Sequence, residues 1–347
     1  MFRLLRNLFG NSSASRAAPK RRAVRLELER LDERMLPSAT SLMSQVMDLH
    51  GNSAVFYIGK DLNLYEIIND GPAQKLTSSG NYGCVSAGLD THGNAMAYMQ
   101  QGDGNFDPNH PTSELDAWDA GRIMVVDPYS VFTEFSAAVN AERVYYLGGG
   151  WSAREANFGT YFTLRGVWSG FTSQQLGTST DWVQVSAGTD IYGKDTAYFI
   201  FSDDHFLDQK VYAWSESSHQ MWQAQNFVAM PVQVVGGRNG YFFCVDVNFN
   251  LWEQTPTGDR FGIVLDVHVR AIMGVGTNSE GAMTVNYERT DNTDMQYDTE
   301  YRYYWNMGSH TGVVAGEGGY NYYMGPFSTL HEIDPYGNDY VIANNLL

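Results

Sequence analysis

The feature that most constrains the fold of this chain is an internal repeat. The segment that starts at Cys84, Cys-Val-Ser-Ala-Gly-Leu-Asp-Thr-His-Gly-Asn, matches the segment that starts at Val183, Val-Gln-Val-Ser-Ala-Gly-Thr-Asp-Ile-Tyr-Gly-Lys, almost position for position. Each copy has the alternating pattern of a short strand, passes through a polar turn and leads into an apolar run. Self-similarity of this kind is typical of repeat architectures, so the rest of the chain can be aligned on these two copies.

That alignment gives seven copies. Their first strands start 38 to 50 residues apart, near Ser44, Cys84, Phe132, Trp182, Pro231, Val269 and Thr311. Repeats of about 40 to 50 residues made of short strands have the length of a propeller blade. The sequence therefore predicts an all-β fold, a single β-propeller over residues 41–347 with seven blades of three to four antiparallel strands, whose first strands lie nearest the axis.

The third and fourth strands are the least regular part of the repeat. We assign third strands to 64–67, 123–126, 161–164, 211–214, 251–254, 301–305 and 328–333. Fourth strands are expected at 74–77, 172–176, 220–224, 261–265 and 339–343, and the second and sixth copies are expected to lack one. A pair of β-sandwiches is the alternative fold, but it does not explain seven copies of one strand order.

Small and turn-forming residues also have a structural interpretation. The Val-Ser-Ala-Gly motif supplies small side chains where blades converge and backbones approach one another. The turns at 90–93 and 190–193 place Asp first and Gly last, as a type I turn prefers; a ring of carboxylates is the alternative. Cys84 and Cys244 fall three copies apart, so we expect buried free thiols rather than a disulfide.

Residues 1–40 differ from the rest of the chain in charge. They hold nine of the 22 basic residues and four of the 39 acidic ones, so residues 41–347 carry 13 basic against 35 acidic residues, a net charge of −22. Arg21 to Leu36 has the pattern of an amphipathic helix, and the segment lacks the apolar core of a secretory signal peptide. We expect a separate leader that is disordered or loosely attached.

Within this leader, Arg25 to Ser38 reads Arg-Leu-Glu-Leu-Glu-Arg-Leu-Asp-Glu-Arg-Met-Leu-Pro-Ser. It resembles the Leu-x-Leu-Glu-x-Leu-Glu-x-Arg-x-Leu/Pro-Ser motif found near the N-terminus of many large secreted or envelope-associated proteins of planctomycete bacteria. The resemblance implies that the protein is secreted or held at the cell envelope. The repeats are similar, more loosely, to tectonin-like and fucolectin-like propeller repeats, in the Val-Ser-Ala-Gly turn and the aromatic third strand, which implies a lectin-like role.

Four connections between second and third strands are expected to be long, at 100–121, 148–160, 202–210 and 288–300. In a propeller these connections emerge on one face, where binding sites on rigid scaffolds tend to be built. Three of them are acidic. The candidate ligand-binding residues on this face are Trp118, Trp151, Asp203, Asp204, Asp208, Asp291 and Asp294. Trp214, Trp252 and Trp305 recur on third strands, where we expect them to pack between blades.

One acidic connection has the donor spacing of a calcium loop. Oxygen donors stand at every second residue, and a glutamate takes the twelfth place: Asp103, Asn105, Asp107, Asn109 and Glu114. Pro108 occupies the position at which an EF-hand needs Gly, and no helical pattern flanks the segment. The alternatives are a Ca²⁺ site and a solvated acidic loop.

The sequence also excludes several classes of function. It contains no Gly-x-Ser-x-Gly, His-Glu-x-x-His, P-loop or Gly-x-Gly-x-x-Gly segment, and its eight histidines lack ligand spacing. The net charge of −22 disfavours nucleic acid and anionic membrane surfaces as partners, and no apolar run is long enough to span a bilayer.

Three hypotheses remain. The first, which the exposed aromatics favour, is a non-enzymatic, monomeric binding module for carbohydrate or protein, with its ligand on the loop face and calcium as a possible aid. The second is a polysaccharide-acting enzyme, because paired carboxylates can be assembled from so acidic a face. The third is a structural protein of the envelope.

Overall fold

The computed structural model describes residues 42–78, 81–101, 114–127, 135–138, 142–148, 152–163, 166–176, 182–202, 209–225, 230–264, 268–325 and 329–343. The leader of residues 1–40 lies outside these ranges, so its predicted state and its role in export stay predictions. Within the described ranges, no helix is long and apolar enough to cross a membrane.

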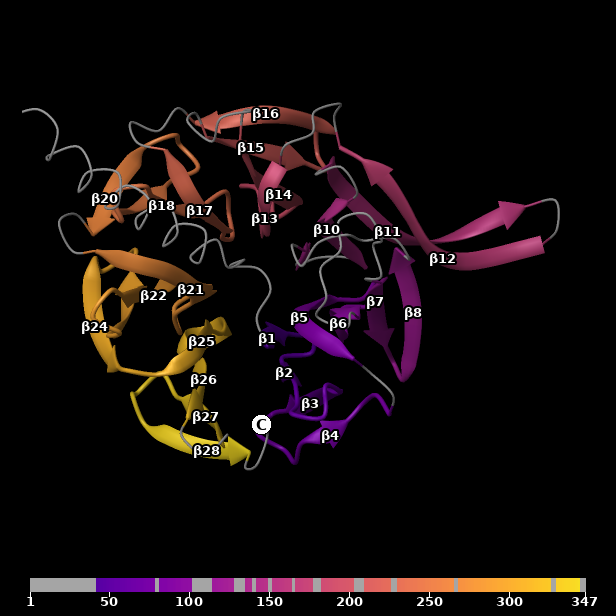
Figure 1. Cartoon of the computed structure of the whole chain (residues 1–347), viewed down its shortest axis with the longest axis horizontal. Coiled ribbons are helices and arrows are strands. Elements are labelled where there is room, and N and C mark those ends of the chain that lie inside the picture. The colour runs from indigo at the N-terminus through magenta and orange to yellow at the C-terminus, as the bar shows by residue number, and fades with distance from the viewer. Residues whose placement is uncertain are drawn as a thin grey trace, which may run out of the picture. The chain divides into compact units, whose positions relative to one another are not determined.

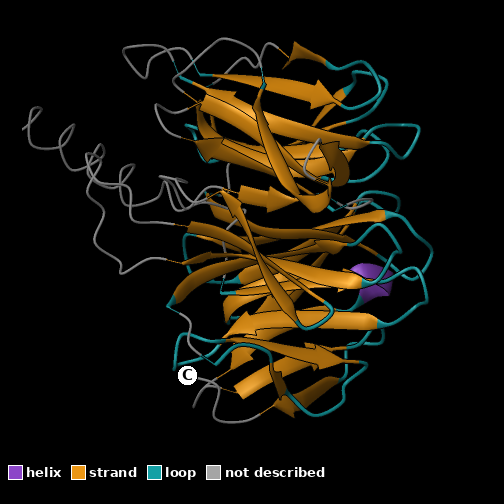
Figure 2. Ribbon diagram, turned by 90° about the vertical axis from the view of Figure 1, so that its right-hand side faces the viewer, coloured by secondary structure: helices purple, strands orange, loops and turns teal. Residues whose placement is uncertain are grey.

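Twenty-eight described strands form seven sheets, each of four consecutive antiparallel strands. The sheets stand in a ring, so the protein is a seven-bladed β-propeller (Figures 1 and 2). This confirms the predicted fold, and the alternative of two sandwiches is wrong. Blade 1 contains β1–β4, blade 2 β5–β8, and so on to blade 7 with β25–β28.

Each blade uses its strands in the same order, from the centre of the ring to its rim (Figure 1). The first strands are β1 (Met43–Met47), β5 (Tyr82–Leu89), β9 (Phe135–Ala137), β13 (Trp182–Thr189), β17 (Pro231–Gly236), β21 (Val269–Thr277) and β25 (Thr311–Ala315). The second strands are β2 (Ser53–Ile58), β6 (Ala95–Gln101), β10 (Arg143–Gly148), β14 (Asp195–Phe201), β18 (Phe242–Asp246), β22 (Met283–Arg289) and β26 (Asn321–Gly325). A short 3-10 helix, η2 (Glu317–Gly319), precedes β26.

The outer half of each blade completes the sheet. The third strands are β3 (Leu64–Ile68), β7 (Glu114–Asp119), β11 (Ser152–Thr163), β15 (Lys210–Ser215), β19 (Leu251–Gln254), β23 (Asp294–Asp298) and β27 (Thr329–Ile333). The fourth strands are β4 (Gln74–Lys75), β8 (Arg122–Asp127), β12 (Gly166–Gln175), β16 (Gln220–Gln225), β20 (Arg260–Val264), β24 (Tyr303–Gly308) and β28 (Asp339–Ala343). Six predicted first strands begin within two residues of the observed ones; the predicted start at Phe132 lies outside the described residues.

Serine side chains on the first strands join neighbouring blades. The hydroxyl of Ser186 in blade 4 accepts a hydrogen bond of 3.0 Å from the backbone N–H of Gly236 in blade 5. The same contact recurs, at 2.9 Å, between three further pairs of first strands: Ser44 with Ala87, Ser86 with Ala137 and Ser136 with Ala187. A backbone donor near the axis is thereby satisfied at each of these blade junctions.

Glycine in the same motif permits the close approach of two blades. An ideal Cβ on Gly188 would lie 2.4 Å from the carbonyl oxygen of Gly237, and one on Gly236 would lie 2.3 Å from that of Ala187. No side chain fits at such distances. The backbones of blades 4 and 5 can therefore meet only because both positions are Gly, as the sequence predicted.

Apolar side chains fill the space between blades. The fully buried Tyr98 of blade 2 packs edge-on against Phe171 of blade 3, with ring centroids 6.0 Å apart. Trp214 of blade 4 is buried, and its indole N–H donates to Glu155 of blade 3 at 3.1 Å, so its predicted packing between blades is confirmed. Each such buried side chain contributes about 1.5–3 kcal/mol.

Two smaller predictions are also confirmed. Asp90 accepts hydrogen bonds from the backbone N–H groups of His92 at 2.8 Å and Asn94 at 2.7 Å, and Asp190 makes the same turn in blade 4. These carboxylates therefore hold turns, which is the interpretation preferred over a ring of carboxylates. Cys84 and Cys244 are buried free thiols.

Blades 7 and 1 meet through side chains, because no sheet contains strands of both. The hydroxyls of Tyr322 in blade 7 and Ser53 in blade 1 lie 3.0 Å apart. An apolar cluster surrounds this contact, with Met43 and Tyr57 from blade 1 and Leu330 from blade 7. The ring is thus closed by packing and a hydrogen bond.

Blades 2 and 6 differ from the predicted strand assignment. Segments 123–126 and 301–305, predicted as third strands, belong to or overlap the fourth strands β8 and β24, and the third strands are β7 and β23. Both blades therefore have four strands. The error has a physical cause: β7 and β23 begin and end with acidic residues, a composition that is typical of loops.

The same correction shortens the predicted connections. β22 ends at Arg289 and β23 begins at Asp294, so the connection predicted at 288–300 is a tight turn. In blade 3, β10 ends at Gly148 and β11 begins at Ser152, which replaces most of the connection predicted at 148–160 by strand. In blade 4 the connection lies between Phe201 and Lys210, as predicted.

Candidate functional site

Most residues of the predicted binding face lie outside the described ranges. These are Trp151, Asp203, Asp204 and Asp208 among the ligand-binding candidates, and Asp103, Asn105, Asp107 and Asn109 among the calcium candidates. Their assignments stay predictions. Among the described residues, no group of three or more His, Cys, Asp or Glu side chains could hold a metal ion.

Glu114 and Trp118 are described, and both lie in strand β7 rather than in a loop. Trp118 is only 9% exposed, and its ring centroid lies 6.0 Å from that of Phe56 in blade 1. The prediction that Trp118 contacts a ligand from a loop is therefore wrong: its indole belongs to the core between blades 1 and 2. Glu114 lies at the first residue of the strand.

Asp291 and Asp294 have different surroundings. Asp291 is exposed in the turn between β22 and β23, where its carboxylate lies 3.4 Å from the guanidinium of Arg289. Asp294 is buried and accepts a hydrogen bond of 2.6 Å from the backbone N–H of His310. Asp294 therefore holds the link between blades 6 and 7 and presents no free carboxylate to a ligand at the surface.

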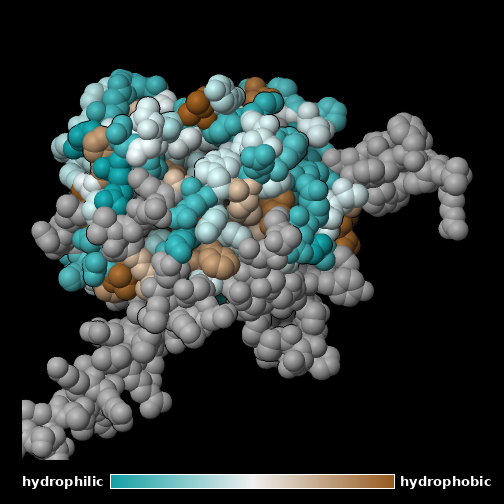
Figure 3. Space-filling view, turned by 90° about the horizontal axis from the view of Figure 1, so that it is seen from above, coloured by the Kyte–Doolittle hydropathy of each residue, from teal (hydrophilic) through white to brown (hydrophobic). Residues whose placement is uncertain are grey.

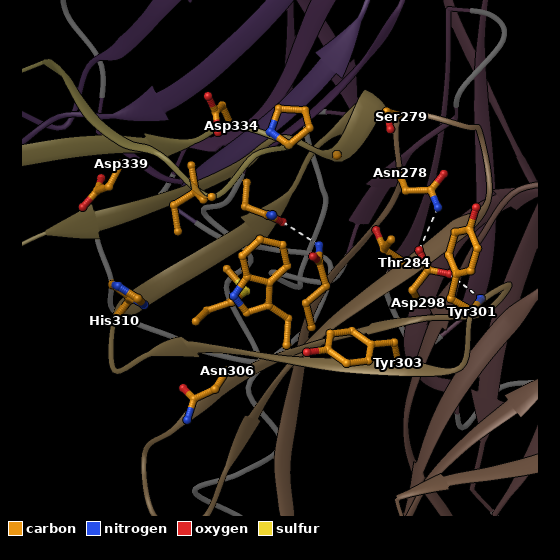
Figure 4. A pocket seen from close by; sticks show the side chains of 18 residues that line it. Asn278, Ser279, Thr284, Asp298, Tyr301, Tyr303, Asn306, His310, Asp334 and Asp339 are labelled. Carbon is orange, nitrogen blue, oxygen red and sulfur yellow. Dashed lines mark hydrogen bonds between the residues drawn. The ribbon is translucent and has the colours of Figure 1, made fainter.

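A groove that the sequence did not predict lies between blades 6 and 7. Its volume is about 580 Å³. One wall is the outermost strand of blade 6, β24, and the other is the β27–β28 hairpin of blade 7, as Figure 4 shows. The β21–β22 turn, with Asn278 and Ser279, borders it at one end, and His310 borders it at the other.

The blade 6 wall of the groove is aromatic. Tyr303 and Trp305 line it, and they are 65% and 44% exposed. Because side chains alternate along a strand, Tyr304 between them points the other way, where its hydroxyl donates to the carbonyl oxygen of Ile263 in blade 5. The strand thus turns one aromatic side chain to the neighbouring blade and two to the groove.

Trp305 lies against the backbone of the opposite wall. An ideal Cβ on Gly337 of the β27–β28 turn would lie 2.8 Å from Cζ2 of the indole. Gly337 also has φ of +83°, in the region that glycine favours. Gly337 therefore adopts the positive φ that the turn needs and also leaves room for the indole of Trp305.

Polar groups border this aromatic wall. The carboxylate of Asp298 accepts hydrogen bonds from the side chain of Asn278 at 2.7 Å and from the backbone N–H groups of Glu300 at 2.9 Å and Tyr301 at 3.0 Å. Deeper in the groove, the side-chain oxygen of Asn321 accepts hydrogen bonds from Asn286 and Gln296. These groups are held in fixed positions by the blades.

Blade 7 contributes two further carboxylates. Asp334 accepts backbone hydrogen bonds from Tyr336 at 2.9 Å and Asn338 at 2.8 Å. The hydroxyl of Tyr323 donates to Asp339 at 2.6 Å, and Nδ1 of His331 lies 2.9 Å from the other oxygen of that carboxylate. Burial alone would raise the pKa of Asp339, but the hydrogen bonds from Tyr323 and His331 outweigh it and hold that pKa below its usual value. Asp339 is therefore ionised at neutral pH.

The sequence does not predict this groove, although it marks one of its aromatic residues. The sequence marks Trp305 as one of the recurring aromatics, but predicts that it packs between blades on a third strand. The structure places Trp305 on a fourth strand, at the rim of the ring. The signal that was available is the run Tyr-Arg-Tyr-Tyr-Trp at 301–305, which is unusually aromatic for the outermost strand of a blade.

Comparisons with known proteins agree on the fold. No protein-family model matches the chain, and no curated protein does. Among solved structures, it is similar to a puromycin hydrolase (TM-score 0.55, 10% identity) and to a puromycin-hydrolyzing peptidase of Mycobacterium tuberculosis (0.54, 9%), with 89% and 92% of this chain covered. The chain spans 55% of the length of each of these two.

A third similar structure is virginiamycin B lyase from Staphylococcus aureus. Its TM-score is 0.52 at 12% identity, and the match covers 83% of this chain and 92% of the lyase. At such low identity these likenesses show the shared propeller fold and nothing about the chemistry of the groove.

Proposed function

We propose that this protein is a non-enzymatic carbohydrate-binding module and that its ligand occupies the groove between blades 6 and 7. The observation that carries the proposal is the pair Tyr303 and Trp305, which present exposed rings to a groove that amide and carboxylate side chains also line. An aromatic face packs against the C–H face of a sugar ring, and the surrounding polar groups bind its hydroxyls.

The dimensions of the groove support this assignment. A volume of about 580 Å³ lies within the range of roughly 300–1,000 Å³ that is usual for small-molecule sites. The groove is formed by strands and tight turns, so a ligand meets preformed walls and little ordering is needed on binding. An oligosaccharide of a few residues suits a site of this size and form.

The location of the protein is the second part of the proposal. The motif at Arg25–Ser38 resembles that of secreted or envelope-associated proteins, and glycans are abundant outside the cell. The net charge of −22 in residues 41–347 argues against nucleic acid and anionic membrane surfaces as partners. We therefore place the protein at the cell envelope or outside it, as a monomer that binds glycans.

A glycan array probed with the full chain tests this function. The parent protein is expected to bind a defined class of glycans, and Trp305→Ala is expected to abolish that binding. Trp222→Ala is a matched control, because Trp222 is 43% exposed on the outermost strand of blade 4, far from the groove in the ring. Equal loss of binding in both variants, or turnover of a bound polysaccharide, would contradict the proposal.

A further inference from the structure

The charge of the groove narrows the class of glycan that it can accept. Three carboxylates, those of Asp298, Asp334 and Asp339, are among the residues that line it. No Lys or Arg is among the described residues that line it. His310 is the one imidazole among these described lining residues, and the three carboxylates outnumber it, so the groove is anionic unless its ligand brings positive charge.

The basic residues of blade 6 are engaged elsewhere. The guanidinium of Arg302 lies 4.6 Å from the ring centroid of Phe261 in blade 5. Arg270 pairs with Glu288 at 2.9 Å, and Arg289 pairs with Asp291 at 3.4 Å. None of these three contacts is with a carboxylate of the groove. Asp339 has the imidazole of His331 beside it at 2.9 Å, so Asp298 and Asp334 are the carboxylates that no nearby Lys, Arg or His pairs with among the described contacts.

The carboxylates also keep the capacity to accept further hydrogen bonds. A carboxylate offers about four lone-pair positions. One oxygen of Asp298 accepts two hydrogen bonds, from the backbone N–H groups of Glu300 and Tyr301. Its other oxygen accepts one described hydrogen bond, from the side chain of Asn278. Asp298 lines the groove, where a charged donor on a ligand can reach its carboxylate.

We propose that the groove selects glycans that carry free amines, namely oligosaccharides of glucosamine-type sugars in their protonated form. The proposal rests on the proposed function, since it assigns the ligand class of the same groove. Tyr303 and Trp305 stack on the sugar rings, and the ammonium groups pair with the carboxylates of the two walls. N-acetylation removes the positive charge, and a uronic acid or sulfate group reverses it, so both disfavour binding.

Titration calorimetry with tetrasaccharides of equal linkage tests this selectivity. The ligands are β-1,4-linked glucosamine, N-acetylglucosamine and glucose, together with a uronate tetrasaccharide, in mildly acidic buffer. The glucosamine tetrasaccharide is expected to bind about tenfold or more tightly than the neutral ones, and its affinity is expected to fall as salt is added. The uronate is expected not to bind.

The variant Asp334→Asn removes a negative charge from the groove and keeps the hydrogen bonds that hold the turn. Asn278 holds a turn of the same type, between β21 and β22 of blade 6, with the same backbone contacts, from Glu280 and Ala282 at 2.9 Å each, so asparagine suits this kind of turn. The variant is expected to weaken glucosamine binding several-fold and to leave the neutral tetrasaccharides unaffected. Asp190→Asn, in a turn of the same type between β13 and β14 of blade 4, is the matched control and is expected to leave binding of every tetrasaccharide unchanged.

The possible results distinguish the two proposals. Tight binding of glucose or N-acetylglucosamine that is lost in Trp305→Ala would overturn the selectivity for amines and leave carbohydrate binding intact. Preference for the uronate, or equal effects of Asp334→Asn and Asp190→Asn, would also overturn the selectivity. Absence of binding to every tetrasaccharide and to the glycan array would overturn both.

Discussion

Trp305 of blade 6 packs its indole against Gly337 of blade 7, so closely that a Cβ on the glycine would lie 2.8 Å from the ring. The contact fixes the position of one wall of the groove against the other. Any atom added at Gly337 must push the indole away, and the stacking surface moves with it. The geometry of the groove therefore depends on residue 337 being a glycine.

Gly337→Ala is expected to reduce glycan binding by an order of magnitude or more. The new methyl group displaces the indole, and φ of +83° adds backbone strain of about 1 kcal/mol. Gly258→Ala is the control, because Gly258 has φ of +88° in the corresponding turn of blade 5 and no atom lies within 4 Å of its ideal Cβ. Both variants should lose similar stability in urea, and only Gly337→Ala should lose binding. Equal binding by the two would contradict the role of this contact.

The stability of the propeller is expected to rise as the pH falls from about 8 to about 5. Burial, followed by the neighbouring Glu114, raises the pKa of Asp116 to about 7, and burial, followed by Asp70, raises that of Glu332 to about 7. Burial also raises the pKa values of Glu66 and Glu142 to about 6. In this window the folded chain binds more protons than the unfolded chain, so lowering the pH favours folding.

Melting temperatures across this pH range measure the effect. Glu332→Gln is expected to flatten the dependence and to raise the melting temperature at pH 8, because the glutamine stays neutral where the buried carboxyl ionises. Glu300→Gln, at an exposed position, is expected to leave the slope unchanged. If the melting temperature of the parent rises steadily from pH 5 to pH 8, these buried carboxyls do not determine how its stability depends on pH.

Ser186→Ala is expected to destabilise the fold by about 1–3 kcal/mol. The substitution removes the acceptor of the backbone N–H of Gly236 at the junction of blades 4 and 5, where Ser186 is buried. Chemical denaturation gives the difference in unfolding free energy. Ser217→Ala removes an exposed hydroxyl that donates to Asp190, and its cost should stay within about 0.5 kcal/mol.

Calcium is expected to stabilise the protein through the connection of blade 2, if the donors at Asp103 and Asp107 bind it. Extracellular modules bind Ca²⁺ with dissociation constants of about 10⁻⁴ to 10⁻³ M, and ligand that binds only the folded chain raises its stability. Millimolar Ca²⁺ should then raise the melting temperature, and Asp103→Asn combined with Asp107→Asn should remove most of the increase. An equal response to Mg²⁺, or an unchanged response of the double variant, identifies a solvated acidic loop.

The sequence predicts the ring because its motif is chemically constrained at the axis. Ser186 and Gly188 each have a function that few residues share, one as an acceptor for the next blade and the other as a point of backbone contact. Such positions repeat along the chain and can be recognised. Their spacing gave the number of blades and the starts of six first strands within two residues.

The groove could not be predicted from the same pattern, because it depends on which strand lies at the rim. The sequence around Trp305 is compatible with a third strand and with a fourth strand. Only the fourth strand of a blade has an outer edge that is exposed to solvent. The assignment failed at β23, where Asp294 is a buried partner of a backbone N–H and not a loop residue. A buried carboxylate and a solvated one are indistinguishable in a single sequence.

Every blade is made of four strands that are consecutive in the chain, and blades 7 and 1 share no sheet. The propeller is therefore seven covalently linked modules whose last junction is non-covalent, held by contacts such as that between Tyr322 and Ser53. The chain can therefore be circularly permuted without breaking a sheet. A linker would join blade 7 to blade 1, and the new termini would lie between two other blades. The groove between blades 6 and 7 survives any such permutation that does not cut at their link.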